Sequence, residues 1–194
     1  MKSISLFLIL LTLVLTSCGQ KLNYPGQLEI RTYKIGDKVD TTLFKKFGDF
    51  YFPNYLDGWT MDNSSHLPAK YKGLPIAIWQ LKSDSSIALT LLNDKILNIT
   101  VSYMKVEEKE RLSKMIVEKF GGDGKSKSYE ETHPFQSWIT YWNLKTWETT
   151  DAIFQIGYSD MRKPEDPIPT DLRWNLVYSD FILESKIIND YKKK

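Results

Sequence analysis

The segment spanning residues 76–103 places the strongest constraint on what this chain can fold into. It contains three apolar runs of strand length, separated by short polar stretches: Ile76–Leu81, Ile87–Leu92 and Lys95–Tyr103. The second and third runs are joined by Asn93-Asp94, which is a two-residue hairpin signal. The segment therefore predicts a β-meander.

A helix is expected directly after this meander, over Val106–Phe120. Its apolar residues form one stripe at helical spacing, made of Leu112, Met115, Ile116 and Phe120. Glutamates gather near its N-terminal end, where their negative charges interact favourably with the helix dipole. Gly121 and Gly122 then supply a stop signal.

Shorter patterns predict the other elements. Gln27–Tyr33 alternates enough for a strand, and Asp40 is a plausible N-cap for a helix that runs through Phe47 and ends at Gly48. Loops are expected at 50–75, 123–134 and 161–171. Three further strands and a terminal helix complete the prediction, at Gln136–Leu144, Ala152–Tyr158, Leu172–Ser179 and Asp180–Tyr191.

Residues 35–104 and 105–180 share an order of elements that suggests a repeat. Phe47-Gly48 and Phe120-Gly121 each end a predicted helix, and Trp79-Gln80-Leu81-Lys82 matches Trp142-Asn143-Leu144-Lys145. Under an internal duplication, Phe47 and Phe120 should occupy equivalent buried places behind one antiparallel sheet. The alternative is that two α-β-β-β runs arose separately and match by chance.

The predicted fold class is α+β, an antiparallel sheet with helices on one face, built from two tandem α-β-β-β repeats. This arrangement resembles the β-lactamase inhibitory proteins and the small BamE-type envelope lipoproteins, in pattern over most of the mature chain and without a diagnostic motif. The resemblance implies that the open face of the sheet binds another protein. It transfers no binding residue to this sequence, and the long second loop and terminal helix depart from its simplest version.

The N-terminus has the pattern of a secretory signal. Lys2 supplies a positive charge, Ile4–Val14 is almost wholly apolar, and Leu15-Thr16-Ser17-Cys18 follows. The apolar stretch is shorter than the roughly 20 residues of a comfortable bilayer-spanning helix, although an uncleaved anchor helix is the alternative. Leu15–Cys18 resembles the bacterial lipobox, which implies cleavage before Cys18, a lipid on its thiol and acylation of the new amine.

This resemblance divides the chain into three parts: residues 1–17 as signal peptide, 18–26 as a lipidated tether and 27–194 as one globular domain. More than one acyl chain would hold the protein firmly on a membrane. No Asp follows Cys18, as it does in inner-membrane retention signals, and no acidic cluster follows, as in surface-export signals. The expected location is therefore the outer membrane, facing the periplasm.

Composition excludes several classes of function. The chain has 26 basic and 24 acidic residues, so its net charge of +2 gives no electrostatic case for a nucleic-acid partner. A single Cys excludes an intrachain disulfide and a Cys-based zinc site. His66 and His133 lie outside any catalytic or metal motif, and no cofactor is expected.

An acidic cluster in the Pro-rich loop has two readings. Asp160, Glu165, Asp166 and Asp171 could offer oxygen ligands to Ca²⁺. A solvated loop is the favoured interpretation, because the spacing is not that of a known calcium loop and Arg162 lies among the acids.

Aromatic residues make up 13% of the chain and supply the candidate binding surface. The leading hypothesis is a non-enzymatic module that binds an envelope protein through an open sheet face, with Trp79, Trp138 and Trp142 as anchors. The alternative is a glycan-binding accessory lipoprotein using Tyr51, Tyr55, Trp59 and Trp147. A third hypothesis is a carboxylate-based hydrolase, for which no pair of acids stands out. Burial of these aromatics in the core stays open as the structural alternative.

Overall fold

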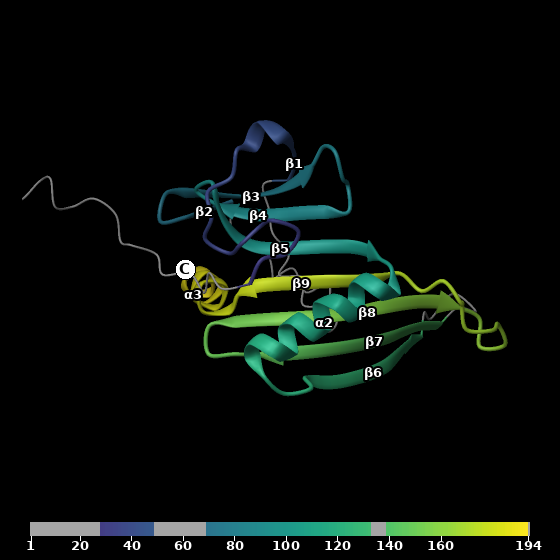
Figure 1. Ribbon diagram of the computed structural model, residues 1–194. Coiled ribbons are helices and arrows are strands. Elements are labelled where there is room, and N and C mark those ends of the chain that lie inside the picture. Colours follow the sequence, from purple (N-terminus) through teal and green to yellow (C-terminus); the bar gives the residue numbers. More distant parts are fainter. Residues whose placement is uncertain (1–27, 49–68, 133–138, 194) are drawn as a thin grey trace, which may run out of the picture.

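The computed structural model describes residues 28–48, 69–132 and 139–193 (Figure 1). The described chain contains a 3-10 turn η1 (Thr41–Leu43), nine strands and two α-helices, α2 (Val106–Phe120) and α3 (Phe181–Lys192). The strands are β1 (Phe44–Gly48), β2 (Lys70–Tyr71), β3 (Leu74–Leu81), β4 (Ile87–Leu92), β5 (Lys95–Met104), β6 (Lys125–Thr132), β7 (Ile139–Glu148), β8 (Ala152–Arg162) and β9 (Trp174–Asp180). They form one sheet, and the α+β fold class is confirmed.

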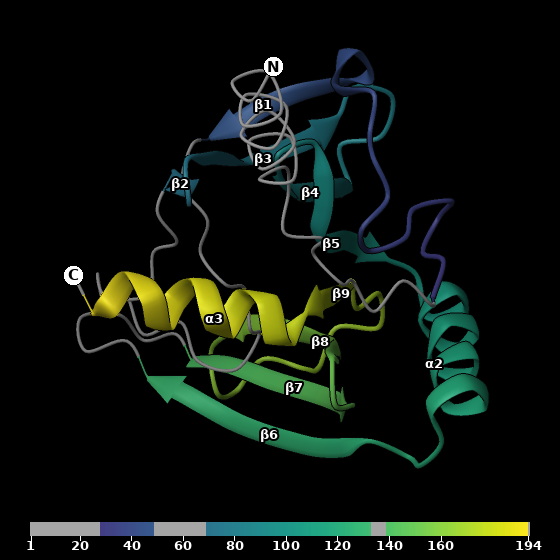
Figure 2. The same ribbon diagram turned by 90° about the vertical axis from the view of Figure 1, so that its left-hand side faces the viewer.

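The sheet consists of two antiparallel halves that meet at their last strands. Its order is β1-β3-β4-β5-β9-β8-β7-β6, with β2 paired to β3. Strands β3, β4 and β5 confirm the predicted meander, and Asn93 and Asp94 both adopt positive φ values, 50° and 63°, as a tight hairpin requires. After β5, helix α2 carries the chain to the far edge, from which β6 to β9 return to the centre (Figure 2).

One row of large side chains crosses most of the sheet on the side that faces α2. The pairing places Leu89 opposite Ile99, Ile99 opposite Tyr178, and Tyr178 opposite Phe154. The rings of Phe154 and Tyr178 stack with centroids 4.2 Å apart, and both side chains are fully buried. Helix α2 covers this row with Leu112 and Ile116 from its apolar stripe, which confirms the predicted helix and its core-facing residues.

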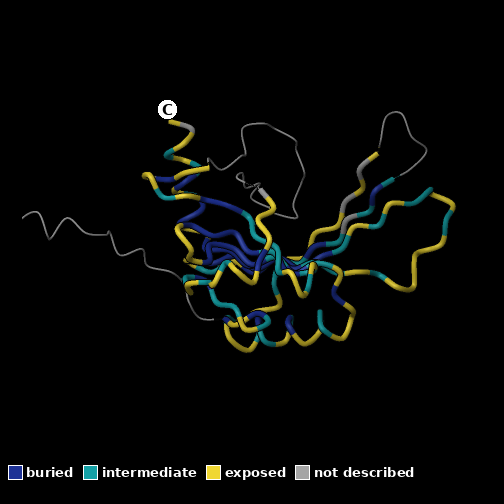
Figure 3. The backbone as a smooth tube through the Cα atoms, turned by 90° about the horizontal axis from the view of Figure 1, so that it is seen from above, coloured by how far each residue is buried: buried dark blue, intermediate teal, exposed yellow. Residues whose placement is uncertain are grey.

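The second helix lies on the opposite face of the sheet. Leu183 and Ile187 of α3 pack with Ile76, Leu92 and Leu97, which belong to the β3–β5 half. The bulge between β4 and β5 accounts for the position of Leu97, which is the extra residue that no β4 residue opposes. Figure 3 shows the two helices on either side of the sheet. The prediction that the helices share one face is therefore wrong.

Helix α3 begins at a buried cap. The Asp180 carboxylate accepts a hydrogen bond from the Leu183 amide at 2.8 Å, as predicted for the N-cap of the terminal helix. Asp180 is only 1% exposed, and burial raises the pKa of its carboxyl to about 6. Its second oxygen has no hydrogen-bond partner among the described residues.

The predicted helix at Asp40–Phe47 is wrong beyond its first turn. Asp40 does cap η1, with its carboxylate accepting from the Thr42 amide, but Phe44 already begins strand β1. Phe47 therefore lies on an edge strand and is 70% exposed, whereas Phe120 ends α2 with its ring 4.8 Å from that of Phe154. The two phenylalanines occupy different elements, so the structure does not support the predicted duplication.

The segment before η1 forms a tight turn, and the strand predicted there is wrong for residues 28–33. Ile30 and Tyr33 pair with each other, while Arg31 and Thr32 between them have positive φ values. Arg31 makes two hydrogen bonds to Glu108 on α2 and one to Asp84 in the β3–β4 turn. The guanidinium lowers the pKa of Glu108, so the contact joins this segment to α2 as an ion pair.

Candidate functional site

A polar hollow of about 280 Å³ lies at the β6 end of the sheet, on the same face as α2. We call it the β6–β8 hollow. Three strands supply its floor, and the loop between β8 and β9 supplies its rim. It is lined by Ser128, Glu130, Tyr141, Asn143, Tyr158, Asp160, Arg162 and Ile168.

The strand register explains why these side chains converge. Ser128, Asn143 and Tyr158 occupy one cross-strand row, and Glu130, Tyr141 and Asp160 occupy a parallel row two residues along. Directly opposed residues in antiparallel strands point to the same face. The two rows therefore place a hydroxyl, an amide, two phenols and two carboxyls on one side of the sheet.

Arg162 is fixed at the end of the hollow. Its Nε donates to an Asp160 carboxylate oxygen at 2.8 Å, and its Nη1 donates to the Asp166 carbonyl at 2.7 Å. Its guanidinium carbon lies 4.0 Å from the centroid of the Tyr141 ring. The Arg162 and Asp160 side chains are only 15% and 9% exposed, so neither reorganises freely when a ligand enters.

An aromatic row continues from the hollow toward α2. Tyr158, which lines the hollow, meets the Trp174 ring edge-on with centroids 4.8 Å apart. The Lys109 ammonium lies 4.7 Å from the centre of the Trp174 ring. The hollow thus opens onto a surface where aromatic rings and a cation adjoin.

The lining is suited to recognition of a polar ligand. Tyrosine and serine hydroxyls, an amide, a carboxylate and a guanidinium can donate to and accept from hydroxyl, amide or charged groups. Ile168, 65% exposed on the loop, adds an apolar contact at the rim. Binding sites typically combine apolar contact area with a few fixed polar groups, although this hollow is smaller and more polar than most.

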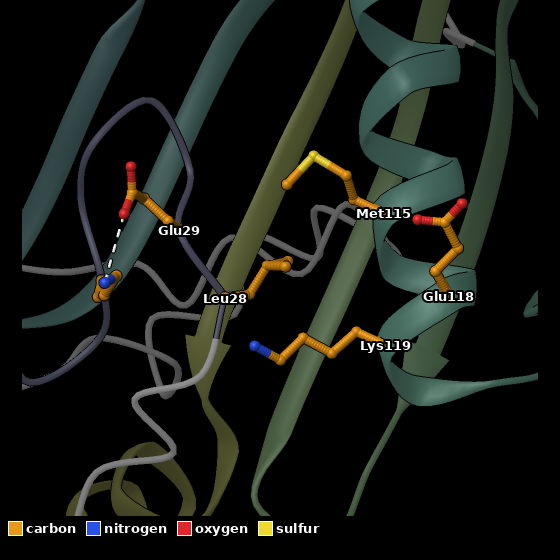
Figure 4. A pocket seen from close by; sticks show the side chains of 6 residues that line it. Leu28, Glu29, Met115, Glu118 and Lys119 are labelled. Atoms are coloured by element: carbon orange, nitrogen blue, oxygen red, sulfur yellow. Dashed lines mark ion pairs between the residues drawn. The ribbon is translucent and has the colours of Figure 1, made fainter.

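A second hollow, of about 450 Å³, lies between α2 and the segment that precedes η1. Figure 4 shows Met115 and Lys119 of α2 extending toward Leu28, whereas the Glu118 carboxylate does not point toward that residue. Lys34 also lines it and pairs with Glu29 at 3.3 Å. Its two acidic and two basic residues balance one another, and its open form gives it fewer fixed contacts than the β6–β8 hollow has.

Two of the sequence-predicted binding residues lie in or against the core. Trp147 continues the buried row next to Phe154, is 4% exposed, and donates to the Gly122 carbonyl at 3.3 Å. The proposed glycan contact at Trp147 is therefore wrong, because its ring is covered. Trp79 continues the same row next to Leu89 and is half-buried against the core on the α2 face.

The remaining predicted residues are described only in part or not at all. Trp142 lies on β7 between Tyr129 and Ser159, and the structure describes its backbone only. Cys18, Tyr51, Tyr55, Trp59, Trp138 and the two histidines lie outside the described residues. Tyr141, which is not among the predicted binding residues, lies in the row that forms the hollow, on the α2 face.

Three of the four acidic residues of the Pro-rich loop, Asp160, Asp166 and Asp171, each have a separate partner. Asp160 pairs with Arg162, and Asp171 pairs with Arg173 at 2.7 Å. The Asp166 carboxylate accepts from the Lys163 amide and closes a turn. Among the described residues, no group of three or more His, Cys, Asp or Glu is placed to hold a metal ion.

Sequence reasoning missed the contribution of β6, which was expected to be a loop. The strand reads KSKSYEET, and every one of its residues whose burial is described is exposed. Because neither face of this strand is buried, its sequence carries no apolar alternation, which is the usual strand signal. The alternation of Lys and Ser over residues 125–128 is the one period-two pattern that could have indicated it.

The three glycines that follow α2 have a backbone reason, and Gly124 also has a packing reason. Gly121, Gly122 and Gly124 all have positive φ values, which confirms the expected helix stop and turn. A Cβ on Gly124 would lie 2.7 Å from the Trp147 ring. The turn therefore passes over Trp147 at a distance that only glycine permits.

Neither of the two α-helices in the described part of the chain has the length and apolar character needed to cross a membrane. Comparison of the sequence with protein-family models and with curated proteins gives no match, and comparison with solved structures gives none either.

Proposed function

We propose that this chain is a lipid-anchored protein of the bacterial envelope that binds a partner protein without catalysing a reaction. The proposed location is the outer membrane, facing the periplasm. The N-terminal sequence supports the anchor, since the apolar run ends directly in the lipobox-like Leu15-Thr16-Ser17-Cys18. Residues 18–26 would then be the tether between the membrane and the domain, whose first described residue, Leu28, is buried in the core.

The arrangement of the β6–β8 hollow is the single observation that carries the binding proposal. Its polar groups stand on three adjacent strands, and Arg162 is held by a carboxylate, a carbonyl and an aromatic ring. Groups fixed in this way lose little conformational freedom on binding, so more of the contact energy appears as affinity. A side chain from a partner protein fits a hollow of about 280 Å³.

A glycan is the second candidate ligand, and the composition of the hollow favours it specifically. The phenols of Tyr141 and Tyr158, the amide of Asn143 and the carboxylate of Glu130 are groups that pair with sugar hydroxyls. The aromatic row through Trp174 would extend such a site. On the described part of the chain this site is the glycan candidate, while Tyr51, Tyr55 and Trp59 stay a prediction outside the described residues.

The anchor is tested by Cys18→Ser. The variant should accumulate as an uncleaved precursor that fails to incorporate a labelled fatty acid, because no thiol is present to receive the lipid. Labelling and fractionation are compared with those of the wild-type chain in the same bacterial host. Labelling of the variant to the wild-type level would refute the anchor proposal.

The binding site is tested by substitution at its rim and floor. Ile168→Asp changes an exposed loop residue, and Tyr141→Ala removes the ring beneath Arg162, so both should weaken binding by about tenfold or more. Tyr191→Ala is the matched control, since Tyr191 is 47% exposed on α3, at the other face. Cross-linking in intact cells identifies partner proteins, and gel retardation with envelope polysaccharides tests the glycan alternative. Equal binding by all four chains would remove the hollow from the proposal.

A further inference from the structure

Strand β6 offers a long, regular edge. It stands last in the sheet order, all eight of its residues pair in register with β7, and no bulge interrupts the ladder. No strand in the described part of the chain pairs with its outer side. An edge of this kind presents backbone N–H and C=O groups to any strand that approaches it.

The charges of β6 are separated along its length. Lys125 and Lys127 lie in the N-terminal half, and Glu130 and Glu131 lie in the C-terminal half. Lys125 forms an ion pair with Glu148 at 3.7 Å, but these side chains are 86% and 54% exposed, so that contact competes weakly. When two such strands run antiparallel, the basic half of each meets the acidic half of the other.

Symmetry limits the registers that a pair of copies can adopt. A two-fold axis perpendicular to the sheet leaves each residue of β6 on the same face in both copies. Directly opposed residues of an antiparallel pair also share a face, so each residue must be opposite one an even number of positions away. The axis therefore lies at a residue position and not between two positions. An axis at any of the four charged positions would place like charges directly opposite each other, and an axis at Ser126 would place Lys125 opposite Lys127, which is destabilising. An axis at Thr132 would pair only the end of the strand. An axis at Ser128 or Tyr129 remains.

We propose that two copies of this chain join through β6, with the two-fold axis at Ser128. In this register Lys125 stands opposite Glu131 of the second copy, Ser126 opposite Glu130, and Lys127 opposite Tyr129. In this register each charged position of β6 is opposite a position in the second copy that carries the opposite charge or a residue type able to form hydrogen bonds. An axis at Tyr129 would instead leave Lys125 opposite position 133, beyond the end of β6.

The pairing joins the two sheets and the two hollows. The sheets of both copies would continue across the axis through β6. Ser128 and Glu130 line the β6–β8 hollow, so both hollows would adjoin at the axis on the same face. An interface of one strand from each copy is small, and we expect a dissociation constant in the micromolar range or weaker.

The proposal is tested with full-length chains that carry two different affinity tags at the C-terminus and are produced in one cell. Wild-type copies should co-purify from a mild-detergent extract. Lys125→Glu with Lys127→Glu makes β6 wholly acidic, and Glu130→Lys with Glu131→Lys makes it wholly basic. For each variant alone, the amount of co-purified chain should fall by about tenfold. The reason is that residues 125 and 131, which are opposed once on each side of the axis, then carry like charges.

Mixing the two variants separates this interface from misfolding. An acidic and a basic β6 are complementary, so co-production should restore co-purification to near the wild-type level. Lys45→Glu with Lys46→Glu changes the same charges on β1 and should leave co-purification unchanged. Failure of wild-type copies to co-purify, retention of pairing by either charge variant alone, or no recovery on mixing would each overturn the proposal.

Discussion

The two edges of the sheet, β1 and β6, differ in length, regularity and charge pattern. Strand β1 has five residues and an irregular register with β3 after Lys46, and its charged residues, Lys45 and Lys46, are both basic. Strand β6 has eight residues in unbroken register and carries both signs of charge. Short edge strands with an interrupted register are typical of strands that resist pairing with another chain. Strand β1 therefore has features that disfavour pairing with another chain, whereas β6 has the length and regular register that the proposed pairing requires.

The two ends of the sheet also differ in the residues that lie next to each edge strand. At the β1 end, β3 and β4 contribute apolar residues to the core, and α3 covers one face. At the β6 end, polar residues line the hollow, and β6 itself is exposed where its burial is described. Stability is therefore concentrated at the β1 end and the centre, and the groups available for recognition at the β6 end.

The largest expected effect at the β6 end comes from Gly157→Ala. A Cβ on Gly157 would lie 2.6 Å from the Asn143 backbone oxygen and 2.4 Å from a Leu144 methyl, so β7 and β8 would have to separate. We expect a loss of about 3 kcal/mol in the free energy of unfolding, measured by urea denaturation. Adding Leu144→Ala removes only the side-chain contact and should fail to restore wild-type stability. A stable Gly157→Ala variant would show that the strands are less tightly packed.

The buried cap of α3 tests the other end of the sheet through pH. Burial raises the pKa of Asp180 to about 6, above its value in the unfolded chain. Protonation of this carboxyl therefore stabilises the folded state relative to the unfolded state. The contribution of this protonation to the free energy of unfolding is complete below the unfolded pKa of about 4 and is lost as the pH rises through about 6. Asp180→Asn keeps the cap, and we expect it to be more stable than wild type by about 2 kcal/mol at pH 7 and by nothing at pH 4.

Glu108→Gln is the control with the opposite sign. Arg31 lowers the pKa of Glu108, so its contribution is present above the unfolded pKa and is lost as the pH falls through the folded pKa. This variant should be less stable than wild type at pH 7, and the difference should shrink in acid. Thermal unfolding across this pH range measures both variants. A pH-independent difference for Asp180→Asn would contradict a buried, titrating cap.

A smaller effect is expected from Arg162→Lys in the β6–β8 hollow. Lysine cannot reproduce two directed hydrogen bonds and the stacking on Tyr141, so we expect a loss of about 1 kcal/mol of stability together with weaker ligand binding. Arg173→Lys is the matched control, because the Arg173–Asp171 pair is exposed and should contribute almost nothing. Equal effects of the two changes would mean that Arg162 is not fixed by its contacts.

The sequence predicts those parts of the fold in which a buried face imposes a period. The meander from β3 to β5, helix α2 and the Asp180-capped helix α3 follow from apolar spacing, turn residues and caps. Strands β1 and β6 were missed because they lack that period: among the residues whose burial is described, β1 buries only Phe44 and β6 buries none. The match of Phe47-Gly48 with Phe120-Gly121 led to the prediction of a duplication that the structure does not support. A short match does not fix burial or secondary structure: Phe47 is exposed on a strand, while Phe120 is packed at the end of a helix.

The candidate site was less predictable because strand register creates it. Glu130, Tyr141 and Asp160 are far apart in the sequence and meet only once β6, β7 and β8 pair. A one-residue shift of any pairing would move these side chains to the opposite face. The exposure of Trp147 was also predicted wrongly. Trp147 lies in the core because it is opposite Phe154, in the cross-strand row of buried side chains that includes Tyr178.

The most direct test of the difference between the two edges is a disulfide at the proposed two-fold axis. The full-length chain with Cys18→Ser has no thiol, so Ser128→Cys introduces a single one. If β6 pairs with itself about Ser128, the two copies of this residue lie directly opposite, within the roughly 4.4–6.8 Å Cα separation that a disulfide spans. We predict a covalent dimer on a non-reducing gel for Ser128→Cys, and none for Ser126→Cys or for Lys46→Cys on β1. No dimer from Ser128→Cys, or equal dimer from all three variants, would contradict the account.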